Sequence, residues 1–237
     1  IYVSPNGSDD NDGLTPETPF KHINFALQQV YGSEDNPATI NLLEGIYSPS
    51  TTNDIFPKWM VSNINLIGSG EETTILDAES TSTVIILDYI DNVTIESLTI
   101  RKGRPLGEYD PDAGGIGEGG HNWAGGGIFS NYSNSLTLRN VTISDNTAYA
   151  FAGIHVWLGV NVYLTNVTIR DNTAEISGGA GCIGTASNIL GSNSEESLTN
   201  VIITGNKAII NDNDSHLGGI LLFFCNPILQ NVTISDN

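Results

Sequence analysis

The chain is poor in the residues that would place it in several familiar protein classes. Its 237 residues include two cysteines, and eight lysines and arginines against 27 acidic residues. Cys182 and Cys225 are too few for a disulfide framework in a chain of this length. Both lie in apolar contexts, GAGCIG and LLFFCNP, that suit small buried thiols. No apolar run approaches the roughly 18 residues of a membrane span, so we expect no transmembrane segment.

The shortage of positive charge narrows the choice of partners. The formal net charge is −19, and binding to nucleic acid requires Lys and Arg to meet the phosphates. We therefore exclude nucleic acid as a partner. A strongly acidic surface fits a secreted or cell-surface protein that stays soluble by self-repulsion, with Ca²⁺ a candidate ion at its acidic loops. Because the first residue is Ile rather than Met, we also expect that an export segment or other upstream sequence has been removed.

An internal repeat dominates the chain. The segments LTLRNVTISDNTA, VYLTNVTIRDNTA, ESLTNVIITGNKA and PILQNVTISDN align, with one asparagine at the same place in each: Asn140, Asn166, Asn200 and Asn231. These asparagines are 26, 34 and 31 residues apart. A small-residue element ending in isoleucine accompanies the repeats, as GGGI, AGI, GAGCI and GGI. No single unit can bury its apolar face, but stacked units form one continuous core.

Within each unit a polar residue occupies every second position beside β-branched residues, which predicts short strands. Short strands separated by Asn, Asp and Gly and repeated at this spacing predict an all-β parallel solenoid with three strands per turn. The recurrent asparagine suits a sharp corner, because asparagine tolerates the left-handed backbone conformation. Stacked about one strand spacing (~4.8 Å) apart, these side chains are expected to form an amide ladder.

The N-terminal region predicts a cap on the first coil. Thr18-Pro19 has the pattern of a helix start, and the apolar side chains of Phe20, Ile23, Leu27 and Val30 then share one face of a helix of about 11 residues ending near Gly32. We therefore divide a single domain, 1–237, into an N-terminal strand and capping helix (1–38) and coils (39–237). The sequence stops inside a repeat, so we expect further coils of the same polypeptide after Asn237.

The opening IYVSPNGSDDNDGLTPETPFKHINFALQQV, followed by INLLEGIY, resembles the start of secreted right-handed parallel β-helix proteins of the pectate-lyase-like superfamily. The NVTI-SDN-TA and GGI units resemble the right-handed β-helix repeats of bacterial surface proteins. Together these resemblances cover nearly the whole chain. They imply a right-handed parallel β-helix with three sheets and an N-terminal capping helix, a scaffold that carries lyases, hydrolases, esterases and adhesins.

One segment concentrates groups that can do chemistry. A basic cluster of Arg101, Lys102 and Arg104 is followed by acids, a histidine and an aromatic residue: Glu108, Asp110, Asp112, Glu118, His121 and Trp123. The resemblance implies that a lyase of this superfamily needs a Lys or Arg base and Ca²⁺ or cations to neutralise a uronate. Candidate catalytic residues are therefore Lys102, Arg104, Asp110, Asp112 and His121. The same segment also suits an inserted loop whose acids face water.

Two further groups of residues are candidates for binding. Asp9, Asp10 and Asp12 suggest a calcium loop, although the EF-hand frame fails and turn chemistry also explains Asn-Asp-Gly. In GIHVWLG the alternation places His155 and Trp157 opposite the aliphatic side chains, exposed on the sheet if the aliphatic side chains point inward. With Trp123 and His216, they are candidate ligand-binding residues, Trp157 as a sugar-stacking surface.

Two functions remain open on the sequence. The first is a non-catalytic secreted or cell-surface module, structural or adhesive, that presents its loops to polysaccharides or other surface proteins. The second is a calcium-assisted polysaccharide lyase or another carbohydrate-active enzyme built around Lys102. The regular repeats, and the near absence of Lys and Arg from them, favour the first.

Overall fold

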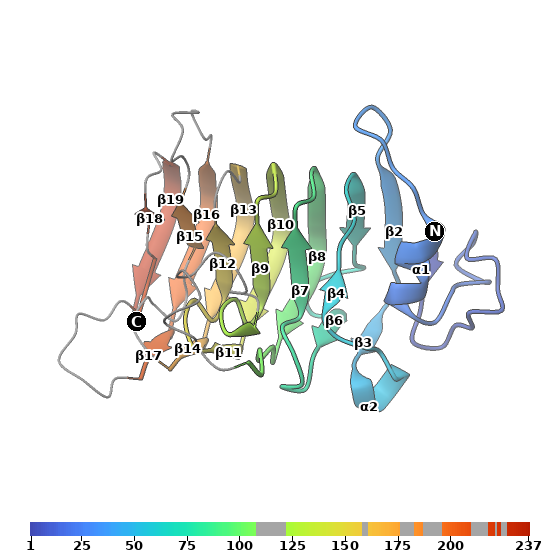
Figure 1. The fold of residues 1–237 in the computed structure, drawn as a ribbon, viewed down its shortest axis with the longest axis horizontal. Helices are drawn as coiled ribbons and strands as arrows, with labels where there is room; N and C mark the ends of the chain where they lie inside the picture. The colour runs from blue at the N-terminus through green and yellow to red at the C-terminus, as the bar shows by residue number, and fades with distance from the viewer. Residues whose placement is uncertain are drawn as a thin grey trace.

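The computed structural model describes residues 1–107, 122–157, 161–175, 183–186, 196–209, 218–220, 222–223 and 227–237, with residues 183–186 and 223 described as backbone only. The described strands form three parallel sheets, which confirms the predicted all-β solenoid. Successive coils stack along the long axis from the N-terminal end to the C-terminal end (Figure 1). Among the described residues no helix is long and apolar enough to cross a bilayer.

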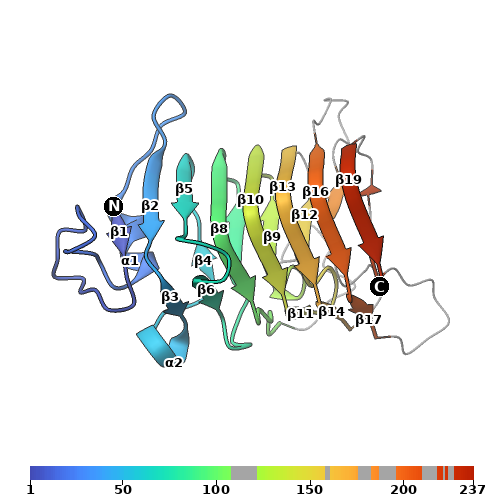
Figure 2. The same cartoon turned by 180° about the vertical axis from the view of Figure 1, so that it is seen from behind.

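The ten-stranded sheet forms one wall of the solenoid (Figure 2). Its main path runs through β1 (Tyr2–Val3), β2 (Ala38–Leu42), β5 (Ile64–Ile67), β8 (Val93–Arg101), β10 (Ser135–Ser144), β13 (Asn161–Arg170), β16 (Ser197–Thr204) and β19 (Ile228–Ser235). The short strands β3 (Gly45–Tyr47) and β6 (Thr74–Asp77) lie beside this path. Equivalent residues of successive repeats pair directly, as Ile143 does with Ile100 and Ile169.

The six-stranded sheet forms the wall that faces the viewer in Figure 1. It consists of β4 (Lys58–Trp59), β7 (Ile85–Asp88), β9 (Ile128–Asn131), β12 (Ile154–Trp157), β15 (Ile183–Ala186) and β18 (Leu222–Phe223). A third, three-stranded sheet contains β11 (Thr147–Ala148), β14 (Thr173–Ala174) and β17 (Lys207–Ala208). The interior between the sheets is filled by stacked Ile, Leu and Val side chains.

An asparagine ladder lies at the corner within the long strands β10, β13, β16 and β19. Asn140, Asn166, Asn200 and Asn231 have φ angles of 51°, 55°, 55° and 54°. The side-chain amide of each donates to the preceding one, at 2.9, 3.0 and 2.9 Å. The left-handed conformation turns each of these strands sharply in mid-course. Asparagine suits this position because it adopts that conformation at little cost.

A second ladder, which the repeats also contain but which we did not predict, lies six residues later, and all its members except Asn237 are buried. It consists of Asn146, Asn172, Asn206 and Asn237. The side-chain oxygen of Asn172 accepts from both the backbone and the side chain of Asn146, and its amide donates to Asn206 and to the carbonyl of Ile143. This ladder therefore satisfies backbone groups that the turns leave unpaired inside the protein.

The N-terminal end is covered by α1 (Ile23–Gln29), with Ile23, Ala26 and Leu27 buried against the core. The predicted start at Pro19 is wrong, because Phe20 bridges to Val3 and His22, directly before the helix, is extended. The helix also ends three residues short of Gly32, with Val30 extended. A second short helix, α2 (Pro49–Thr52), is capped by the side chain of Ser48.

Candidate functional site

The outer face of the six-stranded sheet carries an unusual density of aromatic side chains. Along β7, β9 and β12 the residues that enter the core are Ile85, Leu87, Ile128, Ile154 and Val156. Since side chains of a strand alternate between its two faces, Phe129, His155 and Trp157 lie on the outer face. The register places Phe129 opposite His155, and Asn131 opposite Trp157.

His155 lies at the centre of an aromatic cluster. Its ring stacks on Phe151 with 4.9 Å between centroids and an interplanar angle of 14°, and it contacts Phe129 at 5.1 Å and Trp157 at 6.2 Å. The prediction that His155 is exposed on the sheet is wrong, because this side chain is fully buried. Burial lowers the pKa of His155 from 6.5 to about 3, so the ring is neutral at physiological pH. Neither ring nitrogen has a hydrogen-bond partner within the described part of the chain.

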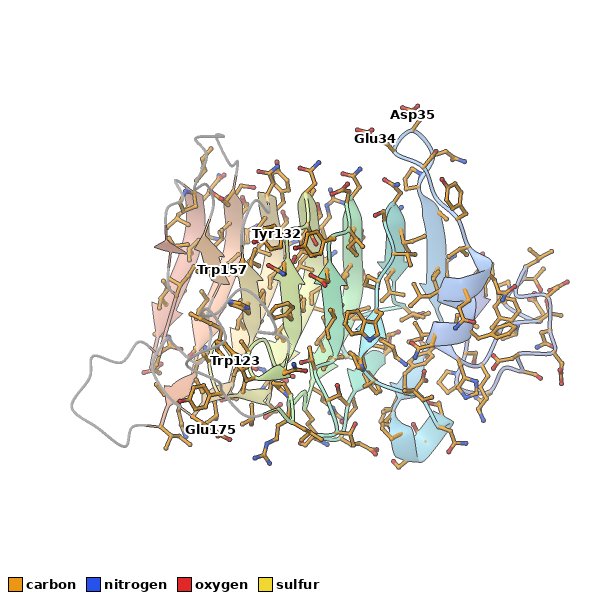
Figure 3. The ribbon with its side chains drawn as sticks, in the orientation of Figure 1. Glu34, Asp35, Trp123, Tyr132, Trp157 and Glu175 are labelled. Carbon is orange, nitrogen blue, oxygen red and sulfur yellow. The ribbon has the colours of Figure 1, made fainter. Side chains whose placement is uncertain are left out.

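An exposed aromatic row, defined here as Tyr89, Tyr132 and Trp157, lies where β7, β9 and β12 end: the tyrosines directly follow β7 and β9, and Trp157 is the last residue of β12. The rings of Tyr89 and Tyr132 are stacked, with 4.7 Å between centroids and an interplanar angle of 13°. They are 68% and 40% exposed, and Trp157 is partly exposed. The backbone N–H of Tyr132 donates to the carbonyl of Trp157 at 3.3 Å, which fixes the two residues in adjacent coils. Figure 3 shows Tyr132 and Trp157 on the same face of the molecule.

Both tyrosines of the row occupy the left-handed region, with φ angles of 53° for Tyr89 and 47° for Tyr132. This conformation is uncommon for a bulky aromatic residue, and such residues concentrate at functional sites. The neighbouring polar pair is also ordered, since the side-chain amide of Asn131 donates to Asp88 at 3.1 Å. The row therefore presents flat apolar rings beside the partly exposed carboxylate of Asp88, which the buried Asn131 amide holds in place.

The basic cluster predicted as a catalytic centre is engaged in ion pairs. Arg101 Nε lies 2.8 Å and Lys102 Nζ 3.1 Å from the same oxygen of the buried Asp77. Arg104 lies 3.5 Å from Glu175. Arg101 and Lys102 therefore neutralise one buried carboxylate, and Lys102 is not a free amine in this arrangement.

Of the other predicted residues of this segment, Trp123 alone lies within the described part of the chain. Asp110, Asp112 and His121 lie outside the described residues, as do Glu108, Glu118 and His216. Trp123 is buried and packs edge-on against Tyr149, with 6.1 Å between the ring centroids. Trp123 is therefore not an exposed sugar-stacking surface. Figure 3 shows it lower on the same face than Trp157, toward Glu175.

Two clefts lie near the basic cluster. One, of about 360 Å³, is lined chiefly by Arg104, Leu106, Tyr149 and Glu175. The other, of about 430 Å³ on the ten-stranded sheet, is lined by residues of both signs: Glu71, Glu72, Arg101, Asp145 and Arg170, together with Ile75, Thr99, Thr142 and Ser144. Neither cleft combines a free base with exposed aromatic rings in the described residues.

The aspartates of the predicted calcium loop make hydrogen bonds within the N-terminal turn. Asp9 accepts from the backbone N–H groups of Lys21 and His22 and from Nδ1 of His22, and Asp12 accepts from the N–H of Leu14 and the hydroxyl of Thr18. Partial burial raises the pKa of Asp9, but the hydrogen bonds from His22 and Lys21 outweigh it and leave the pKa below its usual value. Within the described ranges no group of three or more His, Cys, Asp or Glu side chains is arranged to hold a metal ion, and Asp10 is simply exposed.

Solved structures of other proteins share this overall fold. Pectin methylesterase PemA from Erwinia chrysanthemi matches with a TM-score of 0.54 at 13% identity, over 98% of this chain and 64% of that chain. The fold is a right-handed parallel β-helix. A pectin methylesterase mutant in complex with hexasaccharide IV matches with a TM-score of 0.50 at 15% identity, over 85% of this chain and 65% of that chain. This chain thus spans less than two thirds of the length of either neighbour, and identities this low show the fold alone.

No family model matches the chain, and no curated protein matches it. The candidate site residues therefore rest on the geometry of this structure. Sequence reasoning found Trp157 but missed Tyr89 and Tyr132. The sequence does contain a signal for them, because IILDY and IFSNY each end in a tyrosine directly after an outward-facing strand residue. Those two strand residues, Asp88 and Asn131, pair with each other, and Asn131 pairs with Trp157 in the next coil.

Proposed function

We propose that this chain is a secreted or cell-surface β-helix module that binds a glycan non-catalytically along the aromatic row. The observation that carries the proposal is the exposed, stacked pair of Tyr89 and Tyr132 with Trp157 in the adjacent coil. Aromatic rings offer a large apolar face with a polar tip, which suits the alternating C–H faces and hydroxyls of sugar rings. The hexasaccharide bound to a neighbour of the same fold supports this choice of ligand class.

The geometry of the solenoid suits an extended polymer. Equivalent positions in successive coils recur about every 4.8 Å along the axis, which is close to the length of one sugar unit in an extended glycan. Tyr89 and Tyr132 occupy equivalent positions in adjacent coils, so a chain running along the axis would meet them with successive sugars. It would meet Trp157, one residue before the equivalent position in the next coil, at the sugar that follows. The buried cluster under the row, His155 with Phe129 and Phe151, holds the Trp157 ring in place.

The binding function is preferred to a lyase built on Lys102, because β-elimination needs a base whose amine is free to take a proton. The amine of Lys102 lies against Asp77, a carboxylate that is itself buried and shared with Arg101. Removing either cation from this group would leave a buried negative charge poorly compensated. The pair therefore fits a structural role better than a reacting one.

The test is titration of the protein with a panel of neutral and acidic hexasaccharides, followed by calorimetry and by intrinsic fluorescence. Tyr132→Ala and Trp157→Ala should each weaken binding about tenfold, the loss of one aromatic contact of roughly 1.4 kcal/mol. Tyr31→Ala is the matched control, since Tyr31 is 93% exposed and lies outside the row. Thermal melts of all variants separate lost contact from lost folding.

Two results would contradict the proposal. Binding that is unchanged in both row variants would place the glycan elsewhere. Release of unsaturated products from the acidic hexasaccharides, abolished by Lys102→Ala, would establish catalysis instead.

A further inference from the structure

The charges around the aromatic row define the class of glycan that it can take. We infer that the row selects an uncharged glycan over a polyuronate; this inference rests on the proposed function. It follows from where the eight basic residues of the chain lie and from the carboxylate that accompanies the tyrosines.

None of the eight lysines and arginines, all of which lie in described residues, faces the row. Lys58 belongs to the six-stranded sheet but is fully buried inside the solenoid, where it pairs with Asp54. Arg101, Arg139 and Arg170 are on strands of the ten-stranded sheet, and Lys207 is in β17. The remaining three are Lys21 before α1 and Lys102 and Arg104 after β8.

Arg104 is hydrogen-bonded to the segment that leads into β7, at the opposite end of that strand from the row. Its backbone N–H donates to the carbonyl of Ser82, which precedes β7, whereas the row follows the end of β7. A four-residue strand separates the two ends by about 13 Å. Arg104 is also paired with Glu175, so little of its charge reaches the row.

The row instead carries negative charge of its own. Asp88 is the residue before Tyr89, is partly exposed, and accepts from Asn131, which precedes Tyr132. Asp91 follows Tyr89 by two residues and accepts from the backbone N–H of Asn134. Within a protein of net charge −19, these carboxylates make the local potential negative, whereas a uronate needs a cation or a metal ion close to its carboxylate.

The expected selectivity can be worked from Coulomb's law. A uronate carboxylate within about 6 Å of Asp88 would be disfavoured by roughly three- to tenfold, for effective dielectric constants of about 80 and 40. The penalty should shrink as salt rises, because the screening length falls to about 3 Å at 1 M. A neutral sugar is not repelled by Asp88, so its affinity should hardly depend on salt.

The experiment compares two matched pairs of ligands at about 20 mM and 1 M NaCl: β-1,4-linked hexaglucose with hexaglucuronate, and α-1,4-linked hexagalactose with hexagalacturonate. Each pair differs only in its carboxylates. We expect the neutral member of the bound pair to bind at least about threefold more tightly at low salt, and the difference to narrow at high salt.

Asp88→Asn provides the internal test, because the amide oxygen can still accept from Asn131 while the charge is removed. The substitution should raise the ratio of uronate affinity to neutral-sugar affinity about threefold or more at low salt. Asp35→Asn is the matched control, since it removes the same charge from the projecting loop that carries Glu34 and Asp35 (Figure 3).

The outcomes separate this inference from the proposed function. Tighter binding of a uronate at low salt, or equal improvement by Asp88→Asn and Asp35→Asn, would overturn the selectivity while leaving glycan binding intact. Failure of all four ligands to bind, together with failure of the wider hexasaccharide panel, would overturn the proposed function and this inference with it. Loss of uronate discrimination in Asp88→Asn alone would support both.

Discussion

The buried, neutral His155 makes the stability of the protein depend on pH in a way that one substitution can isolate. In the folded protein desolvation lowers the pKa of His155 from its ordinary value of 6.5 to about 3. Between these two values the unfolded chain binds a proton that the folded chain does not. Stability therefore rises with pH across this window, and the loss on acidification begins as the pH falls below 6.5.

The magnitude follows from the two pKa values. At pH 5 the unfolded state gains about 2 kcal/mol from protonating this one histidine, while at pH 7.5 it gains almost nothing. Wild-type protein should therefore lose about 2 kcal/mol of unfolding free energy from this group between pH 7.5 and 5. Other groups add their own contributions, so the difference between variants is the useful quantity.

The assay is urea unfolding, followed by fluorescence, at pH 7.5 and pH 5 for the wild type, His155→Phe and His155→Asn. Both variants should lose about 2 kcal/mol less than the wild type on acidification, because neither can titrate there. His155→Phe should also be more stable than His155→Asn at pH 7.5, since Phe adds no polar atoms to the aromatic cluster. Equal losses in all three proteins would refute a neutral, buried His155.

Two further predictions concern the interior. Asn172→Ala should cost roughly 3 kcal/mol or more in urea unfolding, because it removes several buried hydrogen bonds at once. Asn166→Gly in the exposed ladder, which removes the side-chain hydrogen bonds without straining the left-handed backbone at φ 55°, should cost about 1 kcal/mol; equal costs would contradict the greater weight given to the buried ladder. Ser130→Ala should leave the protein as stable or about 1 kcal/mol more stable, because the Ser130 hydroxyl is buried without a partner among the described residues. A clear loss of stability in Ser130→Ala would show that this hydroxyl is satisfied in solution.

The solenoid itself follows from local sequence. Period-2 alternation indicates which side chains share a face of a strand. The repeat of the same short segment indicates which residues pair with one another in adjacent coils. The spacing of Asn140, Asn166, Asn200 and Asn231 therefore predicts both the corners and the contacts between them. These features need no knowledge of residues far away, because every coil repeats the same geometry.

The boundaries of the capping helix were harder to predict. Thr18-Pro19 has the local signature of a helix start, but Phe20 is instead held by a bridge to Val3. Local propensity is a weak preference, and a tertiary pairing within the first coil overrides it. The helix therefore begins only at Ile23.

The candidate site was decided by tertiary structure. Alternation places His155 on the outer face of its strand, but it cannot tell what covers that face, and the covering rings bury the side chain. From the sequence Lys102 is a candidate base, but in the folded protein its amine pairs with Asp77, which lies 25 residues earlier. Tyr89 and Tyr132 are 43 residues apart and stack only because the intervening segment closes one coil. Sequence alone thus determined the repeating scaffold, whereas the state of each polar or aromatic group depended on neighbours that only the folded chain brings together.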